Sequence, residues 1–137
     1  MNELVWIDER DALALHSRLL ALYGGAPGVH DHGLLASALA RPRHLQVYAD
    51  NPGVIELAAA YTVRIIRNHP FVDGNKRTGF VAGVLFLEIN GYRLTASEED
   101  ATQAVLGLAA ETLDEAGFLA WLRANSRRNR KRRSSAT

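Results

Sequence analysis

A ten-residue run from His69 to Thr78 gathers most of the side chains in this sequence that could do chemistry. Its order is His-Pro-Phe-Val-Asp-Gly-Asn-Lys-Arg-Thr, and strongly apolar stretches flank it on both sides. Charged groups placed next to a protein core cost free energy unless they are paired or bind something. The run is therefore the first candidate for a ligand-binding or catalytic site.

The residue types in this run predict a site for phosphate groups. The pair Gly74-Asn75 can form a tight turn directly before a helix, where free backbone N–H groups and the helix dipole favour anions. Lys76 and Arg77 add positive charge at the same place. Asp73 is an acid among these cations, which suits a ligand of Mg²⁺ held beside phosphates.

His69 is the candidate catalytic base of the run. It ends the preceding apolar stretch and is followed by Pro70, which restricts the path of the chain. Its neutral imidazole could take a proton from an attacking hydroxyl. Taken alone, a histidine beside a proline more often packs or caps, and Asp-Gly-Asn is more often an ordinary turn. The combination within ten residues is what favours an active site.

The elements that position this run are predicted to be helices. Asp8 can cap a first helix, which the glycines and proline of residues 24–28 end. Asp31 can cap a second helix, which is expected to stop before Pro42. A third follows Gly53 and is apolar nearly all round, which is typical of a buried central helix.

The helical spacing resumes after the polar run. A fourth, mostly buried helix is expected from Phe80 to Ile89, followed by the short extended connector 92–95. Ser97 can cap a fifth helix over 98–110, and Asp114 begins a sixth. The sequence thus predicts an all-α fold, a single compact helical domain with the polar run as a loop between its two central helices.

Composition excludes several other classes of protein. At 137 residues the chain is one domain by length, and without cysteine it can have neither disulfides nor thiolate metal sites. No apolar run approaches the ~20 residues of a membrane span. The N-terminus does not read as a signal peptide. We expect a soluble cytoplasmic protein with no membrane partner.

Charge divides the chain into an acidic body and a basic tail. Six of the 16 Lys and Arg residues lie between 127 and 133, so the net charge of +1 divides into +6 there and −5 elsewhere. We expect a folded domain over 1–126 and a disordered basic tail over 127–137. Binding of nucleic acid through this tail is the less favoured alternative to a solvated extension.

At this point the sequence can be compared with a known family. The pattern His69-Pro-Phe71-x-Asp73-Gly74-Asn75-x-Arg77 resembles the Fic motif, His-Pro-Phe-x-Asp/Glu-Gly-Asn-Gly-Arg-x-x-Arg. Lys76 and Phe80 depart from it, and Asn-Lys-Arg-Thr at its centre is similar to the Doc (death-on-curing) branch of Fic/Doc proteins. The segments 23–28, 31–33 and 39–42 also look like that family.

The resemblance implies roles for these residues. In such enzymes the motif histidine deprotonates a target hydroxyl, so His69 would be the base; Asp73 would hold Mg²⁺, and Gly74, Asn75 and Arg77 would bind the phosphates of ATP. Doc-type members are toxins of type II toxin–antitoxin systems. They transfer the γ-phosphate of ATP to a threonine of elongation factor Tu and so arrest translation. The implied partner is a Phd-like antitoxin whose C-terminal segment folds on binding.

Two alternatives remain at this stage. Most Fic enzymes transfer AMP to a protein hydroxyl, and a degenerate Fic domain could bind a nucleotide or partner without transferring anything. A second arginine at the position of Phe80 would bind the terminal phosphates of the nucleotide, but Phe80 has no hydrogen-bond donor to do so. Lys76 adds a point charge nearer the centre of the loop. These two positions favour phosphate transfer over AMP transfer.

Overall fold

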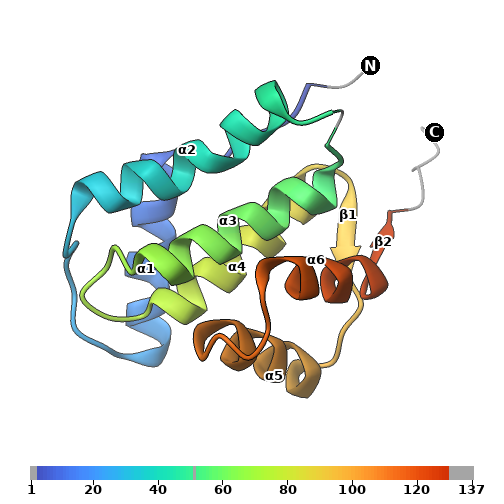
Figure 1. Cartoon of the computed structure of the whole chain (residues 1–137). Helices are drawn as coiled ribbons and strands as arrows, with labels where there is room; N and C mark the ends of the chain where they lie inside the picture. Colours follow the sequence, from blue (N-terminus) through green and yellow to red (C-terminus); the bar gives the residue numbers. More distant parts are fainter. Residues whose placement is uncertain (1–2, 51, 130–137) are drawn as a thin grey trace, which may run out of the picture.

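The computed structural model describes residues 3–50 and 52–129, and it shows a helical protein with one small β-ribbon (Figure 1). The elements are α1 (Glu9–Tyr23), α2 (His32–Tyr48), α3 (Val54–Asn68), α4 (Asn75–Ile89), β1 (Tyr92–Leu94), α5 (Glu98–Ala109), α6 (Glu115–Ala124) and β2 (Ser126–Arg128). The predicted all-α class is confirmed. None of the described helices is long and apolar enough to cross a membrane.

Helix α3 is the centre of the fold. It packs most extensively on α4 and α2, and also contacts α6 and α5. Nine of its fifteen residues are buried, as its nearly uniform apolar pattern predicts. Tyr61 of α3 packs on Phe86 of α4 with a distance of 5.1 Å between ring centroids. The core thus fixes α3 against α4, the two helices that flank the polar run.

Two glycines let α4 approach α3 at backbone distance. The Thr62 hydroxyl donates a 2.8 Å hydrogen bond to the Gly79 carbonyl oxygen. A Cβ at Gly83 would lie 2.9 Å from the Ala58 carbonyl oxygen and would also overlap the Thr62 hydroxyl. The contact between α3 and α4 leaves no room for even a methyl group, because protein interiors are close-packed.

Gly83→Ala is therefore expected to destabilise the protein by about 1–3 kcal/mol, through overpacking that outweighs the better helix propensity of alanine. Urea unfolding measures the change. Gly107→Ala in α5 is the matched control, because a Cβ there meets its nearest neighbour, the Leu113 Cβ, at 3.3 Å. A control that costs as much as Gly83→Ala would contradict the close approach of α3 and α4.

Four of the helix starts are fixed by capping side chains. An oxygen of each cap accepts a hydrogen bond from a backbone N–H in the first turn; the caps are Asp8, Asp31, Ser97 and Asp114. All four were identifiable as polar residues directly before an apolar periodic segment. The predicted starts of these helices are confirmed.

The predicted end of the second helix before Pro42 is wrong. Helix α2 continues to Tyr48, with Pro42 inside it and buried. The buried residues of α2 are Leu35, Ala38, Leu39 and Pro42, which is the helical spacing of one continuous stripe. Packing of this stripe on α3 stabilises the helix beyond the hydrogen bond that proline cannot donate.

Two further expectations need correction. Helix α4 begins at Asn75, five residues before Phe80, so the last four residues of the polar run form its first turn. The predicted connector over 92–95 contains β1, which pairs antiparallel with β2. Arg127 and Arg128 of the predicted tail belong to β2, and residues 130–137 of the tail lie outside the described residues.

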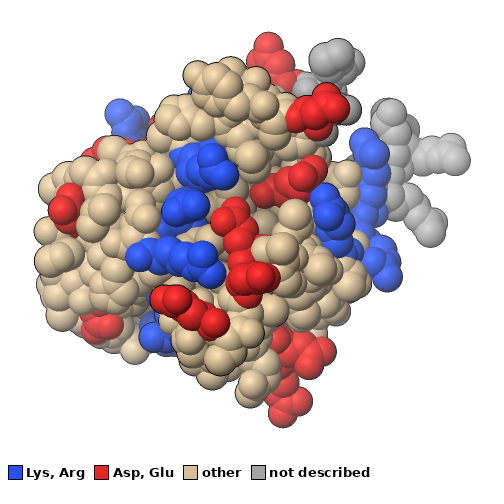
Figure 2. Space-filling view, in the orientation of Figure 1, with Lys and Arg blue, Asp and Glu red and all other residues tan. Residues whose placement is uncertain are grey.

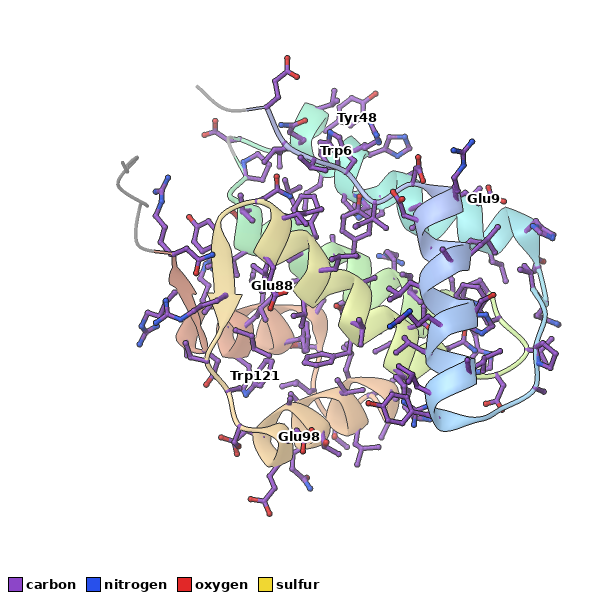
Figure 3. The ribbon with its side chains drawn as sticks, turned by 180° about the vertical axis from the view of Figure 1, so that it is seen from behind. Trp6, Glu9, Tyr48, Glu88, Glu98 and Trp121 are labelled. Carbon is purple, nitrogen blue, oxygen red and sulfur yellow. The ribbon has the colours of Figure 1, made fainter. Side chains whose placement is uncertain are left out.

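The segment before α1 is tied across the back of the molecule (Figure 3). The backbone N–H of Ile7 donates to the Tyr61 hydroxyl at 2.9 Å. Trp6 packs on Phe86 with 5.7 Å between ring centroids. Burial is the main reason that the pKa of Tyr61 rises to about 12. This segment therefore closes the core over Tyr61 of α3 and Phe86 of α4.

Candidate active site

The polar run turns the chain sharply between α3 and α4. His69 ends α3 with a left-handed backbone (φ 53°, ψ 53°), and its N–H donates to the Ile65 carbonyl at 3.1 Å. Gly74, with φ 80°, is the N-cap of α4. A left-handed conformation is natural for glycine and uncommon for histidine. The chain therefore holds His69 in a conformation that its neighbours must stabilise.

Backbone hydrogen bonds fix this loop to the segment that precedes α2. The Pro70 carbonyl accepts from the N–H groups of His30 at 2.7 Å and Asp31 at 3.1 Å, and Val72 N–H donates to the Gly28 carbonyl at 3.0 Å. Segments about 40 residues apart in sequence thus lie side by side (Figure 1). The glycine-rich segment 24–28, read from sequence as a helix terminator, also shapes the site.

The Asn75 side chain closes the loop from within. It is buried, at 4% exposure. Its Oδ1 accepts from the Phe71 N–H at 2.9 Å, and its Nδ2 donates to the Phe71 carbonyl at 2.9 Å. Both polar atoms of the amide thus hydrogen-bond to the loop, so the Asn75 side chain fixes the loop conformation.

The Asp73 carboxylate is held by two backbone groups. Oδ2 accepts from Ala26 N–H at 3.0 Å, and Oδ1 accepts from Gly74 N–H at 2.8 Å. These hydrogen bonds, that from Ala26 first, hold the pKa of Asp73 below its ordinary value, and the charge of Arg77 acts in the same direction. Asp73 is thus a carboxylate at neutral pH, and its lowered pKa means that it takes up a proton at a lower pH than an ordinary aspartate.

Glycine is required at position 25 by this arrangement. Gly25 has φ 127°, and a Cβ there would lie 2.9 Å from Asp73 Oδ2. A side chain at this position would therefore displace the carboxylate from the Ala26 N–H. The sequence did not assign a role in the site to residues 25 and 26.

A cavity of about 460 Å³ opens over this loop. The lining residues are Ile66, His69, Val72, Asp73, Gly74, Asn75, Lys76, Arg77 and Ala109. All six site residues predicted from the sequence thus border one cavity. The volume falls in the range of small-molecule sites. In the space-filling view, Lys and Arg side chains line this face beside Asp and Glu side chains (Figure 2).

The first turn of α4 faces this cavity with free donors. The first helical hydrogen bond of α4 runs from Thr78 N–H to the Gly74 carbonyl at 2.9 Å. The N–H groups of Asn75, Lys76 and Arg77 precede it and have no intrahelical acceptor. The Arg77 guanidinium lies over the Tyr23 ring, 4.4 Å from its centroid, and this contact orients the guanidinium. Donors, dipole and cations together suit an anion such as phosphate.

Comparison with known proteins assigns this arrangement to a family. A model of the Fic/DOC family matches residues 6–87. The chain belongs to the Fic/DOC family. Protein kinase doc of Escherichia phage P1 is 34% identical over 99 residues, which is 72% of this chain and 79% of that protein. Toxin Doc of Mycolicibacterium smegmatis is 41% identical over 92 residues, 66% of this chain and 68% of that protein.

Among the residues that line this cavity, Asp73 is the one carboxylate that could bind a metal ion. Within 3–50 and 52–129 no group of three His, Cys, Asp or Glu side chains could hold a metal by itself. Mg²⁺ is commonly bound by one or two carboxylates together with substrate phosphates and water. Asp73, ionised beside the first turn of α4, fits an ion that arrives with a nucleotide.

His16 of α1 is a residue of this Fic/DOC site that sequence reasoning missed. Its Nε2 lies 2.8 Å from the Asp73 carbonyl oxygen, which can only accept, so Nε2 carries the proton. Its ring stacks on Phe71, with centroids 3.9 Å apart and planes at 8°. The available sequence signal was a histidine at helical spacing among apolar residues, and the structure shows it buried, at 4% exposure. His16 positions the backbone that carries Asp73.

Proposed function

We propose that this protein is the toxin of a type II toxin–antitoxin system and acts as a Doc-like protein kinase. In this proposal it transfers the γ-phosphate of ATP to a threonine hydroxyl of elongation factor Tu, which arrests translation in the cytoplasm. The observation that carries the proposal is that His69, Asp73 and the first turn of α4 border the same cavity. The likeness to proteins named protein kinase doc and toxin Doc supports it.

The residues of the cavity divide the work of phosphate transfer. His69 takes the proton of the target hydroxyl, whose oxygen then bonds to the γ-phosphorus. The bond from that phosphorus to the β–γ bridging oxygen breaks, and ADP leaves. The N–H groups at the start of α4, with Lys76 and Arg77, bind phosphate oxygens and stabilise their negative charge. Asp73 would hold Mg²⁺, which neutralises charge on the phosphates when bound.

Phe80 supports γ-phosphate rather than AMP transfer. It does not line the cavity but a neighbouring groove of about 270 Å³ between α4 and α5, together with Lys76, Arg77 and Leu106. A second arginine at this position would add a phosphate donor beside Arg77. The aromatic ring of Phe80 cannot donate hydrogen bonds to the terminal phosphates, so the γ-phosphate is free to face His69.

The position of the label on ATP tests the reaction. Elongation factor Tu is incubated with the protein and ATP labelled at the α- or the γ-phosphate, with His69→Asn as the inactive control. We expect γ-label on the target and none from α-labelled ATP. Label from α-labelled ATP would establish AMP transfer. Nucleotide binding with neither label on any target would establish a non-catalytic domain.

His16→Phe tests how Asp73 is positioned. Phenylalanine keeps the ring stacked on Phe71 but leaves the Asp73 carbonyl without its donor. We expect a loss of about 1–3 kcal/mol in the free energy of unfolding. We also expect a higher Mg²⁺ concentration for half-maximal phosphate transfer, because the carboxylate shifts with its backbone. Lower stability with unchanged Mg²⁺ dependence would leave His16 with a structural role only.

The toxin proposal also requires a partner. We expect the protein alone to arrest growth when expressed, and a Phd-like antitoxin encoded beside it to restore growth by binding through a segment that folds on contact. Growth is compared between the wild type and His69→Asn at equal protein levels. Normal growth with intact wild-type protein present would contradict the toxin proposal.

A further inference from the structure

The β-ribbon places two positive charges directly opposite each other. In the register of β1 and β2, Arg93 pairs with Arg127, and Tyr92 pairs with Arg128. Residues directly opposite in an antiparallel pair have Cβ atoms about 5 Å apart and share one face of the ribbon. Like charges in this arrangement destabilise the pairing. The fold thus keeps a locally unfavourable pair at this position.

No carboxylate relieves this repulsion among the residues that the structure describes. The arginine ion pairs there are Arg64–Glu115 and Arg123–Glu56, and neither involves the ribbon. Arg127 donates only to the carbonyl of its neighbour Ser126, at 2.9 Å, and the Arg128 guanidinium lies 5.8 Å from the Tyr92 ring centroid. We call Arg93, Arg127 and Arg128, all exposed, the arginine ribbon.

The backbone holds the arginine ribbon in place. Thr95 N–H donates to the Asn125 carbonyl at 2.7 Å, and Asn129 N–H donates to the Gly91 carbonyl at 2.8 Å. The two strands are therefore fixed at both ends. Figure 2 shows Lys and Arg side chains gathered at the edge of the molecule where β1 and β2 lie.

The arginine ribbon is remote from the candidate active site. The cavity lies at the first turn of α4, whereas β1 follows the last turn of the same helix. A helix of 15 residues is about 22 Å long. A ligand on the ribbon would leave the cavity open. The proposed function also does not use these arginines, so the ribbon calls for a separate explanation.

We propose that the arginine ribbon binds a nucleic acid through its backbone phosphates. Guanidinium groups match phosphate geometry, and counterion release makes several such contacts favourable without any reading of bases. The sequence continues directly into Arg130, Lys131, Arg132 and Arg133, which add charge of the same sign. The rest of the chain, with a net charge of −6, repels a polyanion and so restricts binding to this edge. A bound phosphate between Arg93 and Arg127 would relieve their repulsion.

Arg127→Glu tests the proposal, because it separates binding from folding. It places an acid opposite Arg93, so we expect an unchanged or higher Tm. Binding of a fluorescein-labelled RNA hairpin, followed by anisotropy, should weaken about tenfold at about 50 mM salt, and the slope of log affinity against log salt should fall by about one. A DNA hairpin of the same length should bind with comparable affinity, and phosphate transfer should be unchanged.

Arg10→Glu is the matched control. It makes the same change in net charge at the exposed first turn of α1, where an acid suits the helix dipole. Hairpin binding by this variant should equal that of the wild type. The proposal is overturned if both variants weaken binding equally, or if Arg127→Glu binds as the wild type does. It is also overturned if the wild type binds neither hairpin or prefers phosphatidylserine vesicles.

Deleting residues 130–137 separates the arginine ribbon from the residues that follow it. The shortened protein should keep part of its salt-dependent binding, and adding Arg127→Glu to it should remove most of what remains. If the deletion alone abolishes binding, the ribbon is not the site. These measurements do not depend on phosphate transfer, so they can fail or succeed independently of the proposed kinase activity.

Discussion

His69→Asn is expected to lower the rate of phosphate transfer by about 100- to 10,000-fold, the usual contribution of a general base. Asparagine tolerates the left-handed backbone at position 69 but cannot accept the proton. Alanine would confound the experiment, because a left-handed alanine adds strain. The rate is measured with γ-labelled ATP and elongation factor Tu.

Thermal unfolding and nucleotide binding serve as the controls for His69→Asn. Both should match the wild type, because the His69 side chain is exposed at the rim of the cavity rather than packed in the core. A residual rate within tenfold of the wild type would remove His69 from the chemistry. Loss of nucleotide binding would instead assign His69 to substrate recognition.

Asn75→Ala is expected to destabilise the protein by about 2–4 kcal/mol, because it leaves both the N–H and the carbonyl of Phe71 without partners in a buried environment. Phe71 is fully buried, so water cannot replace the lost bonds. The loop that carries Asp73 should loosen at the same time. Urea unfolding gives the free energy, and phosphate transfer should fall with it.

Asn90→Ala is the matched control for that change. The Asn90 amide also clamps a backbone segment, accepting from the Val5 N–H at 2.8 Å and donating to the Val5 carbonyl at 2.9 Å; its Nδ2 donates in addition to the Phe86 carbonyl at 2.9 Å. This second clamp is exposed, so water can satisfy the freed groups. We expect a cost of about 0.5–1.5 kcal/mol. Equal costs for the two variants would show that burial of the Asn75 clamp contributes nothing.

The helices were largely predictable because their signals are local. Asp8, Asp31, Ser97 and Asp114 mark helix starts by their residue type and position, and the uniform apolar pattern of α3 indicates its central place. The end of α2 was not predictable from proline alone, since packing on α3 overrides the local preference. The ribbon was missed because each strand has three residues and its partner lies more than thirty positions away.

The sequence singled out residues that the structure places around one cavity, but their individual roles stay predictions. The polar run from His69 to Arg77 borders one cavity, as its composition suggested. Other features depend on contacts that the sequence does not reveal. The Asn75 side chain hydrogen-bonds to the Phe71 backbone. Gly25 and Ala26 surround the Asp73 carboxylate, and His16 hydrogen-bonds to the Asp73 carbonyl; both contacts join distant segments. Side chains that act on the backbone of a loop leave no spacing pattern in the sequence.

Hydrogen bonds hold the loop from Pro70 to Gly74 along its length; the partners are the segment before α2, Asn75 and His16. Its conformational entropy is therefore already lost when the chain folds, before any nucleotide arrives. Binding a ligand to a preorganised loop carries little ordering cost, so more of the contact energy appears as affinity. Removing one of these hydrogen bonds should accordingly weaken nucleotide affinity, even though no contact between the protein and the nucleotide is lost.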